Sequence, residues 1–205
     1  MFGGTKVPPF WHTGIEPCTL NPDPRMALTA TVYNLDTDLA DIDRGVYQTL
    51  AVRMARQPSE TAEYMLARYL AYCLEYTEGI AFTEGVAAGG EEPAVVVRDL
   101  TGQLTGWIEV GMPGHDRLHR GMKKTGRAAV YTHRTVSQVL AQLNGQGVHR
   151  AAEIPVYGFG AGFIEEVAAT IDRRAKVSVS VTERELYLDV DGRTFTTSIT
   201  EHHFS

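Results

Sequence analysis

The feature that most constrains the fold is an alternation of strand and helix patterns through the middle of the chain. Apolar strand patterns at residues 104–111, 128–133 and 152–159 are separated by helical patterns near 114–125 and 134–145. A helix between two successive strands favours parallel pairing, because the crossover connection packs on the face of the sheet. The middle of the chain therefore predicts a partly parallel β-sheet flanked by helices.

Hairpin patterns stand on both sides of this region. Residues 27–35 and 44–56 each alternate apolar with polar or small residues, and Asp191-Gly192 separates two apolar runs, as in tight hairpin turns. Antiparallel hairpins beside parallel strands make a mixed sheet, so the fold class that we expect is α/β. A length of 205 residues without internal repeats favours a single domain over residues 26–205.

The first 25 residues differ in composition from the rest of the chain. They hold five of its nine prolines, a density that opposes both helix and central strand. We therefore expect residues 1–25 to be a flexible extension, or an upstream start to have been chosen before Met26. The segment also lacks the continuous apolar core of a signal peptide, and no run approaches the roughly 18 apolar residues of a membrane span.

Net charge and cysteine content narrow the class further. A net charge of -6 gives no overall attraction to nucleic acid or to an anionic membrane, so a polyanionic partner would need a local basic patch. Cys18 lies in the proline-rich segment and Cys73 in an apolar helical pattern, which favours a reducing compartment. We expect a cytoplasmic protein that is not inserted in a membrane.

The clearest helical pattern covers residues 58–76. Ser59 stands where a capping residue is favoured, and Glu60 and Glu63 would lie in the first turn, where carboxylates interact well with the helix dipole. This pattern predicts a helix that packs on the sheet through one face. The residues at helical spacing on that face are Ala62, Met65, Leu66, Tyr69, Cys73 and Tyr76.

Two carboxylates interrupt the apolar runs that follow. Asp99 and Glu109 lie ten residues apart on strands joined by a short turn, so both can reach the same end or face of the sheet. A buried carboxylate needs a cation, a metal or hydrogen-bond donors, and two acidic ligands with waters are a common way to hold Mg²⁺. The alternative is structural: Asp99 caps the turn, and Glu109 pairs with a nearby arginine.

A cluster of cations follows on a helix expected over residues 115–127. Helical geometry turns Leu118, Met122 and Thr125 toward the sheet and leaves several of the cations outside. In a chain that is acidic overall, these cations fit either a solvated face or contact with the phosphates of a nucleic acid. The cluster consists of Arg117, Arg120, Lys123, Lys124 and Arg127, of which Arg120, Lys123 and Arg127 are expected to point outward.

Two weaker patterns involve histidine and glycine. His115 and His119 have the i, i+4 spacing of some zinc sites, but no third ligand is evident. Gly158–Phe163 is a glycine-rich stretch after a strand that lacks the full dinucleotide-binding motif. His202 and His203 lie close to the C-terminus, in a stretch expected to be a solvated end.

Several of these stretches together resemble the YaeQ family of small bacterial proteins. The likeness covers nearly the whole chain from Met26 onward, and its most specific pieces are "RQPSET" followed by Arg68, "RDLTGQLTGWIEVGMP" and "AAVYTHR". The resemblance implies a variant of the fold of the PD-(D/E)XK nuclease superfamily. In that superfamily a mixed sheet presents an aspartate and a second acidic residue from adjoining strands, with Mg²⁺ between them and a lysine nearby.

Carried over residue by residue, the resemblance implies three Mg²⁺ ligands. Asp99 matches the aspartate, and Glu109 matches the second acidic residue. Glu60 matches a glutamate that often joins them from the first core helix. In this chemistry the metal activates water and neutralises the phosphate, while a cation stabilises the charge that develops on the phosphate oxygens.

The superfamily's lysine has no counterpart at its usual place. Gly111 stands two residues after Glu109, and the resemblance implies that cations of the next helix take over the role. The candidates are Arg117, Arg120 and Lys124. Arginine binds phosphate well but keeps a fixed charge, so it cannot act as a titrating base near neutral pH.

Three functions follow from these residues. The first is a Mg²⁺-dependent nuclease or phosphodiesterase that acts on nucleic acid through the three carboxylates. The second is a catalytically inactive module of the same fold, related to transcription, that binds a protein partner or nucleic acid through the basic helix 115–127. In the third, the carboxylates form a structural network with Arg68 or Arg98, and the function lies elsewhere.

Overall fold

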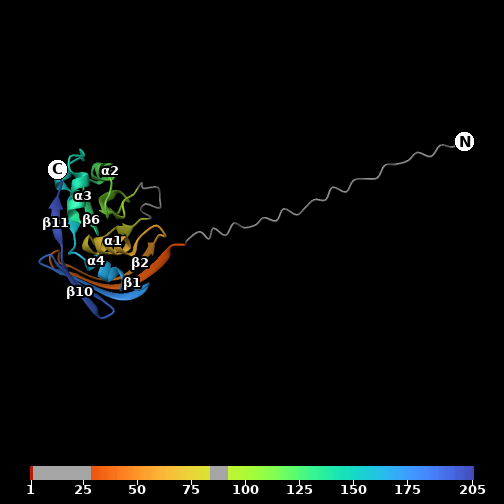
Figure 1. The fold of residues 1–205 in the computed structure, drawn as a ribbon, viewed down its shortest axis with the longest axis vertical. Coiled ribbons are helices and arrows are strands. Elements are labelled where there is room, and N and C mark those ends of the chain that lie inside the picture. The colour runs from red at the N-terminus through yellow and green to blue at the C-terminus, as the bar shows by residue number, and fades with distance from the viewer. Residues whose placement is uncertain (2–28, 84–91) are drawn as a thin grey trace.

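The computed structural model describes Met1, residues 29–83 and residues 92–205. These parts of the chain form two mixed β-sheets and four α-helices (Figure 1). The five-stranded sheet contains, in spatial order, β10 (Arg193–Ser198), β9 (Glu185–Val190), β8 (Arg174–Thr182), β1 (Thr31–Asp41) and β2 (Val46–Arg56). The six-stranded sheet contains β11 (Thr200–His203), β7 (Pro155–Gly158), β6 (Ala128–Thr132), β5 (Leu104–Val110), β4 (Val95–Arg98) and β3 (Ile80–Phe82).

The helices connect strands of these sheets. They are α1 (Ala62–Leu74), α2 (His115–Thr125), α3 (Val136–Leu143) and α4 (Phe163–Ala168). None of the described helices is long and apolar enough to cross a membrane. The extension expected over residues 1–25 lies outside the described residues, apart from Met1.

The local pairings follow the sequence patterns, but the expectation of one mixed sheet is wrong. β1 and β2 form an antiparallel hairpin, as do β4 and β5, whereas β5, β6 and β7 are parallel. The second sheet arises because β8 returns beside β1 in parallel, with Asn34 aligned to Arg174. A polar and apolar alternation specifies a strand and its buried face, but it does not specify a partner so far away in sequence.

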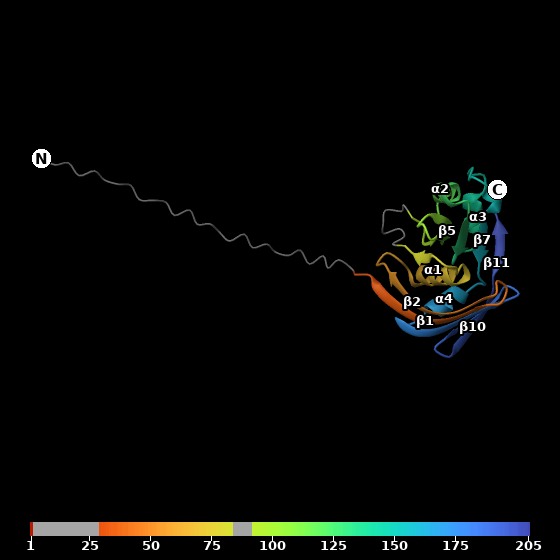
Figure 2. The same cartoon turned by 180° about the vertical axis from the view of Figure 1, so that it is seen from behind.

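Helix α1 lies between the two sheets, as Figures 1 and 2 show together. Nine of its thirteen residues are buried, so the apolar surface extends around most of the helix. One core cluster joins this helix to both sheets, for example through Leu70 of α1, Leu35 of β1 and Ile108 of β5. The single face predicted from helical spacing is therefore narrower than the buried surface of the helix.

The N-terminus of α1 begins two residues later than the cap expected from sequence. Thr61 is the capping residue, and its side-chain oxygen accepts a hydrogen bond of 3.2 Å from the backbone N–H of Tyr64. Ser59 does not cap the helix, and Glu60 lies before the first turn. This placement leaves the Glu60 carboxylate available to an arginine farther along α1.

Helices α2 and α3 pack on the other face of the six-stranded sheet. Leu118 and Met122 are buried there, as predicted for the sheet-facing side of α2, whereas Thr125, the third residue predicted on that side, is only partly buried. Trp107 of β5 is fully buried in the same cluster, and a Cβ atom on Gly121 would lie only 2.4 Å from the Cγ atom of its indole. The glycine therefore allows α2 to approach the sheet closely over the tryptophan.

The C-terminal stretch differs from its expected role as a solvated end. Residues 200–203 form β11, which pairs antiparallel with β7 at the edge of the six-stranded sheet. The side chains of His202 and His203 are exposed, as expected, but their backbone belongs to a strand. Only one residue, Ile199, separates β11 from β10, so the chain passes directly from one sheet to the other.

Candidate functional site

A cavity of about 710 Å³ opens at the carboxyl end of β5. Val110, Gly111 and Pro113 contribute from the end of this strand and the turn that follows, and the amino ends of α1 and α2 form further walls. Crevices outside the carboxyl ends of parallel strands are common binding sites in α/β proteins. The complete lining is Ser59, Glu60, Thr61, Tyr64, Glu109, Val110, Gly111, Met112, Pro113, Gly114, Arg117, His133, Arg134 and Gln138.

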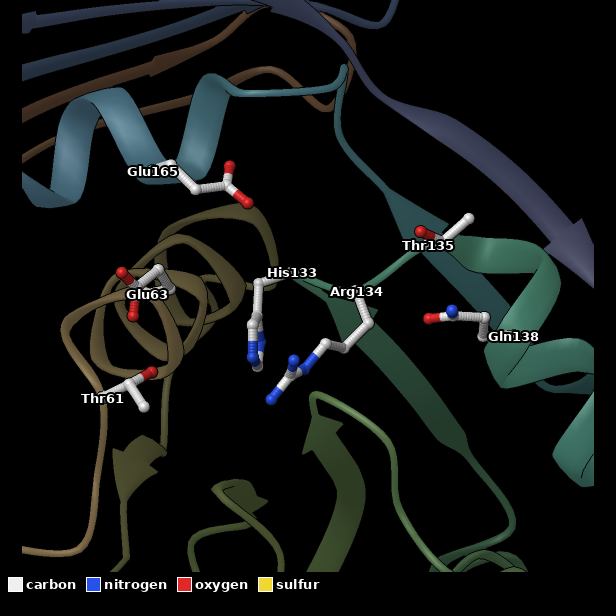
Figure 3. Close-up of a pocket in the computed structure, with 7 residues that line it drawn as sticks. All are labelled: Thr61, Glu63, His133, Arg134, Thr135, Gln138 and Glu165. Atoms are coloured by element: carbon white, nitrogen blue, oxygen red, sulfur yellow. The ribbon is translucent and has the colours of Figure 1, made fainter.

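Two smaller hollows extend this cavity along the ends of β6 and β7. The first, of about 380 Å³, contains Glu63 from α1 and Glu165 from α4, and Figure 3 shows both on the side of His133 away from Arg134. The second, of about 280 Å³, is bordered by the glycine-rich loop 159–162. All three hollows share His133 and Arg134, so we treat them as one continuous trench.

The Glu109 carboxylate projects toward this trench from β5 and is almost fully buried. Its Oε1 atom accepts hydrogen bonds of 2.9 Å from Arg117 Nε and from Trp107 Nε1. Arg117 Nη2 also donates to Glu109 Oε2 at 3.3 Å and to the backbone oxygen of Glu92 at 2.7 Å. The two hydrogen bonds from the Arg117 guanidinium neutralise the carboxylate. This is the structural alternative from the sequence, in which Glu109 pairs with a nearby arginine.

Burial raises the pKa of Glu109 above its ordinary value near 4.5, although Arg117 and the indole N–H of Trp107 act in the opposite direction. A carboxyl group whose pKa is higher in the folded state binds its proton more tightly there. Its contribution to stability is fully present below about pH 4.5 and is lost as the pH rises through the folded-state pKa.

The Glu109→Gln variant tests this linkage, because its side chain does not titrate. We expect the variant to be less stable than the wild type, with a difference that is largest at low pH and shrinks as the pH rises toward neutrality. Urea unfolding of both proteins across this range measures the difference. Asp116→Asn on the exposed side of α2 is the control, and its difference from the wild type should not follow that trend.

Glu60 also borders the main cavity, and it too has an arginine partner. Arg68 Nη1 lies 3.2 Å from Glu60 Oε1, and the backbone N–H of Gln57 donates to Glu60 Oε2 at 3.1 Å. Both side chains of the ion pair are buried, at 2% and 8% exposure. Arg68 donates in addition to the backbone oxygen of Ala55, so the pair connects α1 to the end of β2.

Asp99 lies elsewhere, in the exposed turn between β4 and β5. Its Oδ1 atom accepts hydrogen bonds from the backbone N–H groups of Thr101 and Gln103, each at 2.9 Å, and from the Thr101 hydroxyl at 2.6 Å. These donors, led by the Thr101 hydroxyl, lower the pKa of Asp99 below its ordinary value. Asp99 therefore caps the turn and does not line the trench.

The arrangement of these carboxylates does not fit the Mg²⁺ site that the resemblance implies. To bind Mg²⁺, carboxylate oxygens must give up their hydrogen bonds to protein donors. A guanidinium group beside a carboxylate also repels the metal cation. Glu60 and Glu109 each hold an arginine, and Asp99 lies outside the trench. Within residues 29–83 and 92–205, no three His, Cys, Asp or Glu side chains are grouped closely enough to hold a metal ion.

The backbone conformation explains why a glycine stands at the position where the superfamily has its lysine. Gly111 has a φ of +82°, in the left-handed region that side chains disfavour. A Cβ atom there would also lie 3.2 Å from the Cε1 atom of His133. A lysine could not be placed at this position without changing the turn that leads from β5 into α2.

The cations of α2 divide into two groups. Arg117 lies at the trench and pairs with Glu109, whereas Arg120, Lys123 and Lys124 lie on the exposed side of the helix. In the described part of the chain, Lys123 and Lys124 take part in no ion pair. The fifth predicted cation, Arg127, is half exposed but forms an ion pair with the buried Glu75, so it does not simply point into solvent.

Sequence reasoning missed the two residues at the centre of the trench. His133 and Arg134 follow the carboxyl end of β6, and their position after a parallel strand was the available signal. Burial lowers the pKa of His133, so its neutral form is favoured, and its Nδ1 atom has no hydrogen-bond partner among the described residues. Arg134 is exposed and supplies a positive charge at this point.

The helical histidines make local contacts. His115 Nε2 lies 3.2 Å from Asp116 Oδ1, and His119 Nδ1 accepts a hydrogen bond of 3.2 Å from the backbone N–H of His149. The His119 and His149 ring centroids are 6.4 Å apart. The contacts between His119 and His149 connect α2 to the loop before β7.

Comparison with known proteins identifies relatives along most of the chain. The model of the family described as "YaeQ protein" matches residues 26–199. The "Uncharacterized protein YaeQ" of Escherichia coli K12 is 28% identical over 85% of this chain and 97% of that protein. The protein of the same description from Salmonella typhi is also 28% identical, over 80% of this chain and 90% of that protein.

Two crystal structures have the same fold. The YaeQ protein from Pseudomonas syringae is 28% identical and superposes with a TM-score of 0.76, covering 84% of this chain and 95% of that one. The YaeQ protein from Xanthomonas axonopodis pv. citri is 25% identical and gives a TM-score of 0.77 over 86% and 100% of the two chains. The family model and these relatives together establish that the chain belongs to the YaeQ family.

Proposed function

We propose that the protein is a catalytically inactive module of the nuclease-like fold that binds nucleic acid through its phosphate backbone. The observation that carries the choice between binding and hydrolysis is the ion pair of Glu109 with Arg117. The guanidinium already supplies the positive charge that a metal ion would bring to this carboxylate. A Mg²⁺-dependent nuclease or phosphodiesterase is the competing prediction, and the experiment below distinguishes the two.

The charges on and around α2 support contact with phosphates. The capping residue Gly114 and Arg117 in the first turn of α2 line the trench. The exposed side of the helix carries three further cations, Arg120, Lys123 and Lys124. The amino ends of α1, α2 and α3 also open on the trench, and the dipoles of helices favour anions at these ends. A phosphate backbone that runs along α2 toward Arg134 would meet positive potential at the cations of α2 and again at Arg134.

Acidic residues limit where the nucleic acid can lie. Glu63 and Glu165 border the trench on the side of α1 and α4, across His133 from Arg134 (Figure 3). The chain as a whole also carries a charge of -6, which repels polyanions at long range. We therefore expect modest affinity that depends strongly on salt and is concentrated on the α2 side of the trench.

Replacing both Lys123 and Lys124 by alanine tests the basic surface. We expect the dissociation constant for a labelled single-stranded DNA to rise roughly five- to tenfold at low salt. The slope of log affinity against log salt should fall in magnitude by about 1.4 if each lysine contacts one phosphate. Fluorescence anisotropy with single-stranded DNA, its duplex and an RNA of the same sequence gives both quantities.

A matched control removes two exposed cations on the other sheet. Arg53→Ala with Lys176→Ala changes the net charge by the same amount, so it should leave the affinity within about twofold if the α2 surface is the binding site. Equal weakening in both double variants would rule out this surface. Cleavage of the same nucleic acids with Mg²⁺ or Mn²⁺, abolished by Glu109→Ala, would contradict the proposal and support the nuclease.

A further inference from the structure

The five-stranded sheet has one face that no described helix covers. Figures 1 and 2 show α1 and α4 on its inner side and α2 at the far end of the molecule. Two shallow hollows of about 320 and 350 Å³ lie on the outer face and share Asp38, Thr49 and Ser178. We call this combined depression the outer trough.

Two exposed tyrosines lie in one row across the strands at one end of the trough, and Tyr47 is part of its lining. Tyr47 of β2 is paired with Ala40 of β1. Ala40 is paired in turn with Ser180 of β8, and Ser180 with Tyr187 of β9. The tyrosines are 62% and 43% exposed. With adjacent strands about 4.8 Å apart, they stand roughly 14 Å from each other over small residues. The row therefore provides two aromatic side chains with space between them.

The adjacent rows are rich in carboxylates. Asp38 and Asp189 lie one row from the tyrosines, and Asp36 lies one row farther, next to Lys176. The Thr49 hydroxyl donates to Asp38 Oδ1 at 2.9 Å, which leaves the second oxygen open. Among the described residues, the Asp36 carboxylate has no hydrogen-bond or ion-pair partner, although its backbone belongs to the ladder of β1. Three carboxylates and a single ammonium group give the trough a negative charge.

We propose that the outer trough docks a segment rich in arginine or lysine from a partner protein. Carboxylates form charge-assisted hydrogen bonds with guanidinium and ammonium groups, and tyrosine rings attract the same cations through their faces. The charge complementarity favours a cationic polypeptide and disfavours nucleic acid, whose phosphates the aspartates repel. The trough is separate from α2, so both surfaces can be occupied in one molecule.

The test uses a fluorescein-labelled oligo-arginine peptide, with binding measured by fluorescence anisotropy at moderate salt. Asp36→Asn with Asp38→Asn is expected to raise the dissociation constant about fivefold or more, and Tyr47→Ala about two- to fivefold. Glu78→Gln with Asp116→Asn is the matched control, because it removes two exposed carboxylates outside the trough. The control should change the dissociation constant by less than about twofold.

Two results would overturn the proposal. Equal weakening in the control would mean that the peptide responds to net charge alone. Sedimentation of the wild type tests a second copy as the occupant, since the exposed cations of α2 are also complementary to the trough. Self-association that the Asp36 and Asp38 substitutions abolish, without any effect on peptide affinity, would assign the trough to that contact. The substituted residues are at the surface, and unchanged thermal unfolding verifies the fold.

Discussion

Replacing Arg117 by alanine is expected to lower the free energy of unfolding by about 3–5 kcal/mol at neutral pH, because Glu109 then remains buried without a cation. Among the described residues, the indole N–H of Trp107 is then the one donor left to the carboxylate. Without Arg117 the pKa of Glu109 rises further, so the loss should be greatest at neutral pH and smaller where the carboxyl group is protonated. Urea unfolding of the variant and the wild type, at neutral pH and at a low pH where the carboxyl group is protonated, measures the loss of stability under each condition.

Two further variants separate the loss of the pair from the loss of a surface cation. Lys124→Ala removes an exposed charge of the same helix and should change the stability by no more than about 0.5 kcal/mol. Replacing Glu109 and Arg117 together by leucine and methionine removes both charges and should recover most of the lost stability. If Arg117→Ala is as mild as the lysine control, the buried ion pair does not exist in solution.

Replacing Arg68 by alanine is the second change with a large expected effect. The arginine is only 2% exposed, and it binds the Glu60 carboxylate and the backbone oxygen of Ala55. Its guanidinium also lies 5.7 Å above the ring of Phe82. The variant leaves the buried Glu60 carboxylate without its cation and removes a donor from the Ala55 carbonyl, so we expect a loss of about 3–5 kcal/mol in the free energy of unfolding.

Arg53→Ala is the matched control for this prediction, since Arg53 lies on β2 with an exposed side chain. Its effect on stability should lie within about 0.5 kcal/mol. Thermal unfolding followed by circular dichroism compares the two variants with the wild type. A loss at Arg68 no larger than that at Arg53 would contradict the role given to the pair between α1 and β2.

The elements with strong periodicity could be predicted because local residues determine them. Leu118 and Met122 marked the buried side of α2, and the sequence around Asp191-Gly192 marked the hairpin of β9 and β10. The partner of each strand could not be predicted in the same way, since β8 pairs with β1 through contacts between distant residues. Weak local signals also explain why β3 and β11, of three and four residues, were missed.

The candidate site shows a similar division. Glu60 and Glu109 do border one cavity, as the resemblance implied, but spacing along the chain could not reveal the arginines that neutralise them. Arg68 reaches Glu60 from two turns farther along α1. Asp99 interrupts an apolar run in the sequence, yet the strand ends before it, so its carboxylate serves the turn. The role of a charged residue depended on neighbours that only the folded chain provides.

The pairing of β1 with β8 also determines when the protein can fold during its synthesis. Asn34 on the first strand aligns with Arg174, so the ribosome must release most of the chain before the five-stranded sheet can close. Until then the β1–β2 hairpin has an open edge, and α1 has only part of its final surroundings. Unpaired strand edges and late non-local contacts are sites of aggregation in nascent chains. We therefore expect truncation before β8 to yield insoluble fragments, because the remaining chain cannot cover β1.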